Sequence, residues 1–158
     1  MKNFTLNTIG SINNNDKGFS IKLFDDYLPG ITGLEDFSYI NILWWADRHD
    51  NESDRANLSE NNPYKGSPDI LGTFATRSPK RPNPIGITTC YVTHIDKENK
   101  LIHLAFIDAD DLTPVLDIKP YHPSSDTVLD PNMPEWAKAF PKSLEESADF
   151  DWSKVFNF

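Results

Sequence analysis

The chain of 158 residues lacks disulfide-forming cysteines, long apolar runs and a nucleotide-binding glycine motif. Its single cysteine, Cys90, excludes an internal disulfide and is typical of proteins from a reducing cytosol. No apolar run approaches the roughly 20 residues of a membrane span, and residues 1–15 are polar and rich in Asn, unlike a secretion signal. We therefore expect a cytoplasmic protein without a membrane partner.

No GxGxxG segment follows a predicted strand, so the sequence does not support a Rossmann-type fold. Hydrophobic residues make up 38% of the chain and aromatic residues 12%, which favours a globular protein over a disordered one. The length fits one domain over residues 1–158. Cys90 lies in an apolar, β-branched run, so we interpret it as a small core residue rather than a nucleophile.

Acidic residues are absent from residues 70–95, although the whole chain has a net charge of −9. Within this segment, three prolines between Pro79 and Pro84 fix φ and remove amide donors, which excludes a regular helix or a central strand there. Three cations lie in or beside the proline-rich loop: Arg77, Lys80 and Arg81. A rigid cationic loop in an acidic protein is a candidate anion site; the alternative is a solvated turn.

Short β-prone segments dominate the rest of the chain. We expect strands at 4–12, 19–24, 39–45, 70–76, 85–95, 101–108 and 115–118, a long loop with one helical turn at 47–68, and a short helix at 135–140. The first two strands and the pair 85–95 and 101–108 are predicted hairpins. Since no βαβ alternation is present, the pattern predicts a mainly β fold, a small closed or nearly closed β-barrel.

A second cluster of charge lies in the sequence Asp-Ala-Asp-Asp-Leu-Thr-Pro at 108–114. Three carboxylates in four residues cannot all be buried without partners. The cluster is either an acidic turn without a metal or a cation site. Its spacing does not match an EF-hand, and no His/Cys cluster supports zinc, so we expect no metal.

The extended segment 117–121 alternates, which places Asp117, Lys119 and Tyr121 on one face. That face is either part of a reaction cleft or a cross-strand ion pair beside a packed tyrosine. His122, which follows, is interpreted as a surface residue.

Two long strings, ATRSPKRPNPIG at 75–86 and TPVLDIKPY at 113–121, resemble motifs of the TsaA-like (TrmO, YaeB) family, as does the shorter GLEDFSYI at 33–40. The resemblance covers roughly residues 5–125. Characterised members use S-adenosylmethionine to methylate N6 of threonylcarbamoyladenosine at position 37 of tRNA. The resemblance therefore implies a non-Rossmann β-barrel, that cofactor, a tRNA partner and a homodimer with its site near the subunit interface.

The resemblance and the residue chemistry together assign three sets of site residues. Cofactor binding is assigned to Arg77, Asp47, Arg48, Asp108, Asp110, Asp111, Leu112 and Thr113. The resemblance places Asp117, Lys119 and Tyr121 at the catalytic cleft. RNA binding is assigned to Lys80, Arg81 and Asn83, although Asn83 could equally bond the local backbone. Arg77 is our first choice for an anionic group, with a structural ion pair as its alternative.

The chain departs from the family pattern at several points. Leu112 stands where the family has Gly and is not expected to adopt φ > 0 easily, and Asp47 stands where the family often has His. The Pro-Arg-Gln segment of longer members is missing. An acidic, aromatic tail at 130–158 replaces their extra domain, and we expect it to pack on the barrel or on a neighbouring subunit. Its aromatic residues also favour a homodimer: Phe150, Trp152, Phe156 and Phe158.

Two alternative functions remain open at this level. One is a catalytically silent barrel that binds a small anionic ligand or RNA. The other is a methyltransferase for a different small substrate, which suits a net charge of −9 better than tRNA does.

Overall fold

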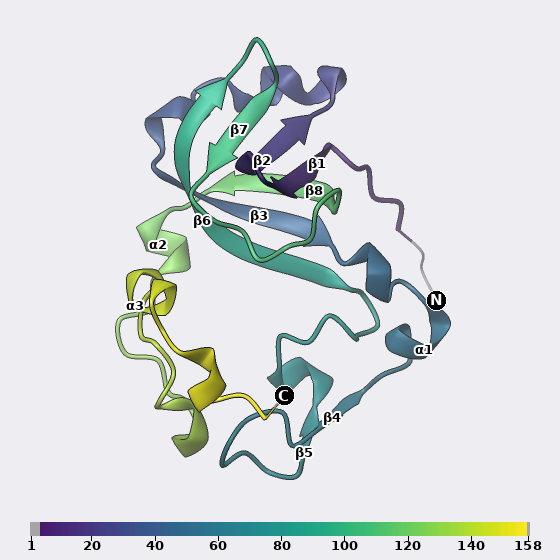
Figure 1. Cartoon of the computed structure of the whole chain (residues 1–158), viewed down its shortest axis with the longest axis vertical. Helices are drawn as coiled ribbons and strands as arrows, with labels where there is room; N and C mark the ends of the chain where they lie inside the picture. The colour runs from purple at the N-terminus through teal and green to yellow at the C-terminus, as the bar shows by residue number, and fades with distance from the viewer. Residues whose placement is uncertain (1–3, 158) are drawn as a thin grey trace.

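Six antiparallel strands close into a barrel in the computed structural model, which describes residues 4–157. Around the barrel the order is β1-β2-β7-β6-β3-β8 (Figure 1). The strands are β1 (Gly10–Asn15), β2 (Gly18–Leu23), β3 (Tyr39–Trp45), β6 (Ile85–Asp96), β7 (Leu101–Leu104) and β8 (Pro114–Pro120). The prediction of a closed, mainly β barrel is confirmed.

Isoleucine fills the barrel interior because its β-branched side chain suits the inner face of a pleated strand. Ile12, Ile21 and Ile102 are opposite one another across β1, β2 and β7, and all three are fully buried. Burying each such side chain contributes about 1.5–3 kcal/mol. Cys90 is also in this core, as predicted. Burial, helped by the negative charge of Asp108, raises the pKa of the Cys90 thiol to about 12.

Both predicted hairpins are present, with shifted ends. β1 begins at Gly10 rather than at residue 4. It ends at Asn15 rather than at residue 12, because the polar residues Asn13–Asn15 still pair with β2 and leave a two-residue turn. β7 ends at Leu104 instead of 108, where the chain turns into the loop that closes the barrel end. The strand predicted at 70–76 is β5 (Ile70–Gly72) followed by a 3₁₀ turn at Thr73–Ala75.

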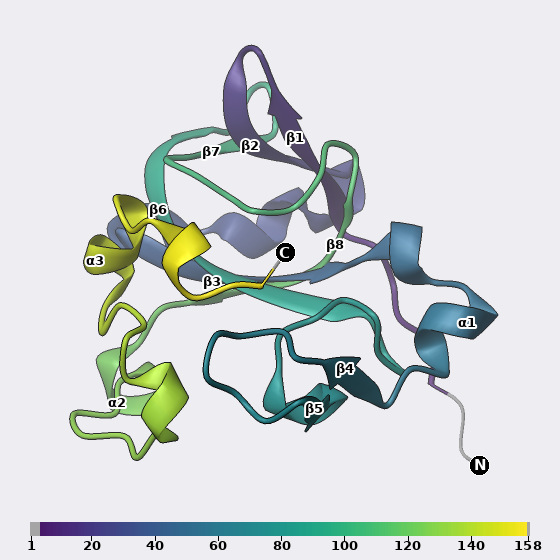
Figure 2. The same ribbon diagram turned by 60° about the horizontal axis from the view of Figure 1, so that its bottom comes forward.

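An arm (residues 47–84) leaves the barrel after β3 and returns at β6 (Figure 2). A backbone hydrogen bond of 2.8 Å from Ala46 N to Pro84 O closes its neck. The arm contains a 3₁₀ turn at 47–49, α1 (Glu52–Arg55) and a two-stranded sheet of β4 (Ser59–Asn61) and β5. The sequence did not predict β4, since its residues are polar and have low β-propensity.

The C-terminal tail returns to the arm of the same chain. Beyond α2 (Pro123–Asp126), it contains 3₁₀ turns at Glu135–Ala137 and Trp152–Lys154 and the helix α3 (Leu144–Ala148). The helix predicted at 135–140 is thus only one 3₁₀ turn. Two further 3₁₀ turns, Asp25–Ile31 and Leu34–Asp36, precede β3.

Tyr64 of the arm is the centre of the contact between arm and tail. Its ring stacks on Trp136 at 5.0 Å between centroids and lies 5.6 Å from Phe156. Lys65 N donates to Val155 O at 2.8 Å. The tail therefore packs on the arm of its own chain, whereas we expected it to pack on the barrel or on a neighbouring subunit. Phe158 lies outside the described residues.

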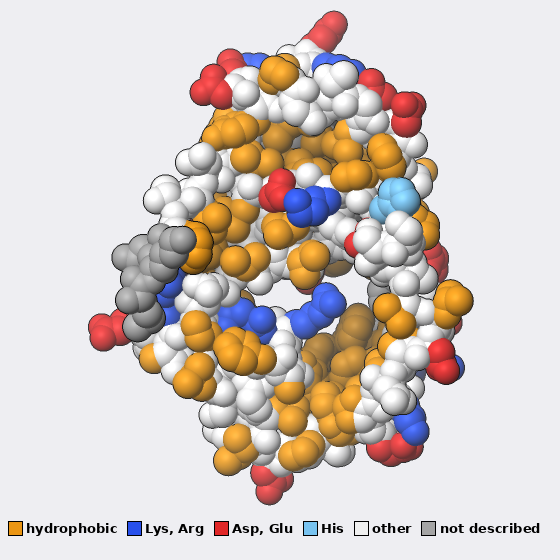
Figure 3. Space-filling model, turned by 180° about the vertical axis from the view of Figure 1, so that it is seen from behind, with side chains coloured by type: hydrophobic (Ala, Val, Ile, Leu, Met, Phe, Trp, Pro, Cys, Tyr) orange, Lys and Arg blue, Asp and Glu red, His pale blue; other side chains and the backbone are white. Residues whose placement is uncertain are grey.

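Barrel, arm and tail surround an opening, and Figure 3 shows Lys and Arg side chains at its rim. Across residues 4–157, no helix is long and apolar enough to cross a membrane.

Candidate functional site

Three segments far apart in the sequence meet in a pocket of about 140 Å³ at one end of the barrel. They are the end of β3 with the turn that follows it, the proline-rich loop, and the loop between β7 and β8. The lining residues are Trp44, Ala46, Asp47, Arg48, His49, Pro79, Asp108, Ala109, Asp110 and Thr113. The structure thus brings together five residues that the sequence assigned to cofactor binding: Asp47, Arg48, Asp108, Asp110 and Thr113.

Each carboxylate of the acidic turn is exposed and has its own partner. Asp108 Oδ1 accepts a hydrogen bond of 2.6 Å from Thr88 Oγ1. Asp110 Oδ2 pairs with Arg48 Nη1 at 3.0 Å. Asp111 Oδ1 accepts from the backbone N of Asn14 at 2.8 Å, which ties the turn to β1. Asp108 and Asp110 line the pocket, whereas Asp111 does not.

Leu112 adopts the left-handed conformation that we did not expect of it, with φ at 67°. Its N–H donates to Ile12 O at 2.7 Å, so the surrounding turn holds this backbone in place. Left-handed backbone costs a non-glycine residue about 1–2 kcal/mol. The backbone of residue 112 therefore has the left-handed conformation that glycine adopts without strain. The Leu112 side chain is 71% exposed and does not line the pocket.

The proline-rich loop has no regular secondary structure at Pro79–Pro84, as predicted. Arg81 holds the loop together: its Nε donates to Ser78 O at 2.6 Å and its Nη2 to Thr76 O at 2.7 Å. A longer bond of 3.4 Å reaches Thr73 O. The structure thus gives Arg81 a role inside the loop, and its contact with RNA stays a prediction.

Arg77, Lys80 and Asn83 have exposed side chains that make no hydrogen bond or ion pair with any other residue in the described range 4–157. The structural ion pair considered for Arg77 and the local backbone bond considered for Asn83 are therefore not formed. Pro79, two residues after Arg77, lines the pocket. The Arg77 guanidinium is thus an unpaired cation on the segment that borders the pocket.

Sequence analysis missed Trp44, His49 and Pro79 as lining residues. Trp44 is opposite Gly86 across β3 and β6, and its Nε1 donates to Thr88 Oγ1 at 3.0 Å. His49 Nδ1 lies 2.8 Å from Asp54 Oδ2, and this hydrogen bond is the main cause that lowers the pKa of Asp54. The aromatic run that precedes Asp47 was the available signal for Trp44.

The predicted catalytic residues lie on β8 or just after it, outside the pocket lining. Asp117 Oδ2 and Lys119 Nζ form an ion pair at 2.7 Å within one strand, not across two. The hydrogen bond to Asp117 raises the pKa of Lys119. Tyr121 Oη hydrogen-bonds Thr127 Oγ1 at 2.6 Å, and its ring contacts Tyr39. His122 is exposed, as predicted. The catalytic roles stay predictions.

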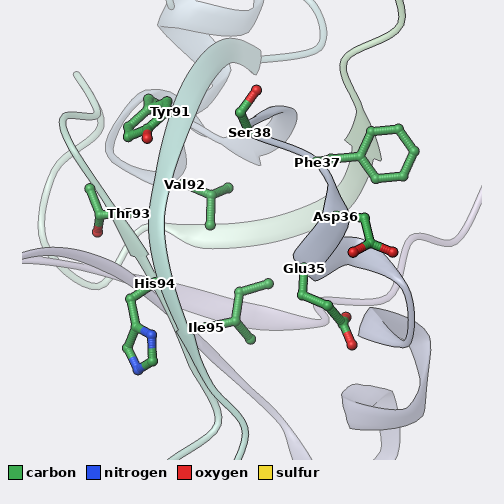
Figure 4. A pocket seen from close by; sticks show the side chains of 9 residues that line it. All are labelled: Glu35, Asp36, Phe37, Ser38, Tyr91, Val92, Thr93, His94 and Ile95. Carbon is green, nitrogen blue, oxygen red and sulfur yellow. The ribbon is translucent and has the colours of Figure 1, made fainter.

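A larger hollow, of about 450 Å³, lies near the opposite end of β3 (Figure 4). It is lined by residues 35–38 and 91–95. Figure 4 shows the side chains of Tyr91, His94 and Phe37 pointing away from one another. A ligand site needs a few convergent polar groups. We therefore place the candidate site in the smaller pocket, where oppositely charged side chains gather.

Among the described residues 4–157, no three His, Cys, Asp or Glu side chains gather to hold a metal ion. The expectation of a metal-free site stays a prediction.

Comparisons with known proteins agree on one family. Residues 9–127 match the family described as tRNA-methyltransferase O N-terminal domain. A probable S-adenosyl-L-methionine-binding protein of Methanocaldococcus jannaschii is 38% identical over 122 residues, which are 73% of this chain and 90% of the relative. An S-adenosyl-L-methionine-binding protein of Archaeoglobus fulgidus is 38% identical over 108 residues, 68% of this chain and 72% of the relative.

The structural and eukaryotic matches cover less of the other chain. A crystal structure of TrmO from Pseudomonas aeruginosa superposes with a TM-score of 0.62 at 26% identity, and the match covers 83% of this chain and 62% of that one. A second TrmO crystal structure gives a TM-score of 0.64 at 27% identity, covering 84% and 64%. A tRNA (adenine(37)-N6)-methyltransferase of Mus musculus is 35% identical over 99 residues, 63% of this chain but only 22% of the mouse protein.

Proposed function

This chain belongs to the tRNA-methyltransferase O N-terminal domain family, and on that premise we propose that it transfers a methyl group from S-adenosylmethionine to N6 of threonylcarbamoyladenosine at position 37 of tRNA. The observation that carries the proposal is the pocket itself. Residues assigned to cofactor binding converge there from the turn after β3 and from the β7–β8 loop, and Pro79 of the proline-rich loop borders them.

The side chains present fit the chemistry of S-adenosylmethionine. The unpaired guanidinium of Arg77 suits a carboxylate, which it can bind through two parallel hydrogen bonds. The carboxylates of Asp47 and Asp108 suit ribose hydroxyls and an ammonium group, and the indole of Trp44 offers an apolar surface. When bound, S-adenosylmethionine supplies an electrophilic methyl group carried by a sulfonium.

The protein contributes binding and alignment more than covalent chemistry, because methyl transfer to nitrogen is a direct displacement. The transfer would replace the sulfur–carbon bond of the cofactor by an N6–carbon bond, and the N6 proton would pass to water. We assign Asp117, Lys119 and Tyr121 to the substrate side of the site, as the family resemblance implies. The Asp117–Lys119 ion pair would then present one positive and one negative group to the modified base.

The tRNA itself would meet the exposed side chains of the proline-rich loop. Lys80 and Asn83 are exposed there, and the loop is rigid because Arg81 binds its carbonyl oxygens. Phosphate contacts by Lys and Arg supply most of the affinity of proteins for nucleic acids. A tRNA substrate also agrees with the cytoplasmic location that we expect.

We also infer a homodimer. A pocket of about 140 Å³ is small for this cofactor, since ligand pockets usually exceed about 300 Å³. A second subunit could complete it, and the apolar side chains of Ile85 and Ile87 on β6 are 40% and 50% exposed. The aromatic tail no longer supports this inference, because it packs on Tyr64 of its own chain. Light scattering tests it: a mass near 18.0 kDa at micromolar concentration contradicts the dimer.

One observation favours another substrate: a net charge of −9 is unusual for an RNA-binding protein. The test is a methylation assay with labelled S-adenosylmethionine and bulk tRNA, with and without the threonylcarbamoyl modification. Label in modified tRNA alone supports the proposal. Cofactor binding without label in either tRNA indicates a different substrate or a silent binding protein.

A further inference from the structure

A short chain of hydrogen bonds crosses the barrel end beside the pocket. Trp44 Nε1 on β3 donates to Thr88 Oγ1 on β6 at 3.0 Å, and Thr88 Oγ1 donates to Asp108 Oδ1 at 2.6 Å. Three elements of the barrel are thereby joined through one hydroxyl group. Of these three side chains, Trp44 and Asp108 line the pocket and Thr88 does not.

The direction of both hydrogen bonds is fixed by chemistry. An indole nitrogen can only donate, so the Thr88 hydroxyl must accept from Trp44. The hydroxyl has a single hydrogen, and an ionised carboxylate can only accept, so that hydrogen is directed to Asp108. Thr88 therefore has one arrangement that satisfies both neighbours, and this arrangement fixes one oxygen of Asp108.

The second carboxylate oxygen of Asp108 remains available. Asp108 Oδ2 makes no hydrogen bond within the described residues, and the side chain is exposed at the pocket. The neighbouring carboxylates are bound elsewhere, Asp110 to Arg48 and Asp111 to the Asn14 backbone. Asp108 is thus the one carboxylate of the turn that both lines the pocket and has no ion-pair partner among residues 4–157.

We propose that Thr88 is a positioning residue, which orients the Asp108 carboxylate so that its second oxygen accepts a hydrogen bond from a hydroxyl or ammonium group of the cofactor. This inference rests on the proposed function, since it concerns the same pocket. The inference extends the proposed function, because it assigns a role to Thr88, which does not line the pocket.

Gly86 keeps this arrangement possible. A Cβ atom at Gly86 would lie 2.5 Å from Trp44 Cδ2 and closer still to two other ring atoms. The indole can therefore lie across β6 and reach Thr88, two residues further along the strand, only because residue 86 has no side chain.

The experiment compares two substitutions at Thr88 with a matched control. Thr88→Val removes the hydroxyl at nearly constant volume, whereas Thr88→Ser keeps it. Thr89→Val is the control, because Thr89 Oγ1 makes a similar bond of 2.7 Å to Asn41 Oδ1 but belongs to no chain that reaches the pocket. Calorimetric titration with S-adenosylmethionine gives each Kd, and thermal unfolding gives each stability.

We expect Thr88→Val to weaken cofactor binding about 3- to 10-fold, the range for one hydrogen bond, while Thr88→Ser and Thr89→Val bind like wild type. Asp108→Asn should weaken binding at least as much, and adding Thr88→Val to it should cause little further loss, because both act through one contact. If Thr88→Val folds poorly, Thr88→Ala replaces it.

The outcomes separate this inference from the proposed function. Wild-type protein that binds no S-adenosylmethionine overturns both. Wild-type binding that Thr88→Val and Thr88→Ala leave unchanged overturns the positioning role alone. Equal losses in Thr88→Val and Thr88→Ser also overturn it, because a role in packing rather than in hydrogen bonding would then explain the effect.

Discussion

Gly86→Ala should disrupt the barrel end although it adds only one methyl group. The new Cβ would lie 2.5 Å from Trp44 Cδ2 and nearer to Cε2 and Cζ2, whereas carbon atoms in contact are about 3.5–4.0 Å apart. The indole must therefore move by at least about 1 Å. This movement breaks its 3.0 Å hydrogen bond to Thr88.

The expected cost follows from these contacts. Forcing extra volume into a packed site costs about 1–3 kcal/mol, and losing one hydrogen bond costs about 1 kcal/mol. Replacing Gly by Ala returns about 0.5–1 kcal/mol through the unfolded state. The net destabilisation is about 1–3.5 kcal/mol, which lowers the Tm by about 2–14 °C in a chain of this size.

Thermal and urea unfolding measure this cost, and Gly72→Ala is the matched control. Gly72, the last residue of β5, has extended backbone with φ at −62°, and a Cβ there would meet nothing within 4 Å. We expect Gly72→Ala to be as stable as wild type or slightly more stable. If Gly86→Ala matches the control, the Trp44 ring does not lie across Gly86, and its hydrogen bond to Thr88 is not formed either.

Three further predictions concern separate residues. Arg77→Lys keeps the charge but loses the planar guanidinium, so calorimetry should show S-adenosylmethionine binding weakened by about 1.5–3 kcal/mol. The control Lys80→Arg should leave the affinity unchanged. If Arg77→Lys binds the cofactor as tightly as wild type, Arg77 is not part of the site. Leu112→Gly relieves a φ of 67° and should raise the free energy of unfolding in urea by about 0.5–1 kcal/mol; a loss of stability contradicts the strain. Cys90, with a pKa of about 12 and 2% exposure, should resist iodoacetamide in the native protein at about pH 8 and react only on unfolding, whereas fast native labelling contradicts its burial.

The barrel could be predicted because short local sequence patterns indicate most of its strands. Alternating or β-branched runs mark β2, β3 and β6, and Cys90 falls among buried side chains as its neighbours indicate. Polar pairings could not be predicted. Asn13–Asn15 and β4 pair with neighbouring strands through backbone hydrogen bonds, and their polar side chains do not indicate this pairing in the sequence. The contact of the tail with the arm was not predicted, because Tyr64, the partner of its aromatic residues, lies in a segment interpreted as loop.

The candidate site could be predicted only in part, because motifs identify residues but do not show how the strands pair. Asp47, Arg48 and Asp108 could be named from motifs, and the fold brings them to one pocket. Thr88 could not be named, because its role depends on the register that sets Trp44 opposite Gly86. The positive φ of Leu112 was not expected, because the propensity of leucine disfavours it. The hydrogen bond from Leu112 N to Ile12 O of β1 helps to hold the residue in this conformation.

We propose that S-adenosylmethionine binds in the pocket at the barrel end that contains Trp44, Asp108 and Thr113. The most direct measurement is a crystal structure of the protein with S-adenosylhomocysteine, the product that methyl transfer leaves behind. We expect density for the product in that pocket, with its carboxylate within hydrogen-bonding distance of Arg77. Density in the larger hollow lined by residues 35–38 and 91–95 would show that the cofactor binds elsewhere, and crystals that bind no product at saturating concentration would exclude a cofactor site in the pocket.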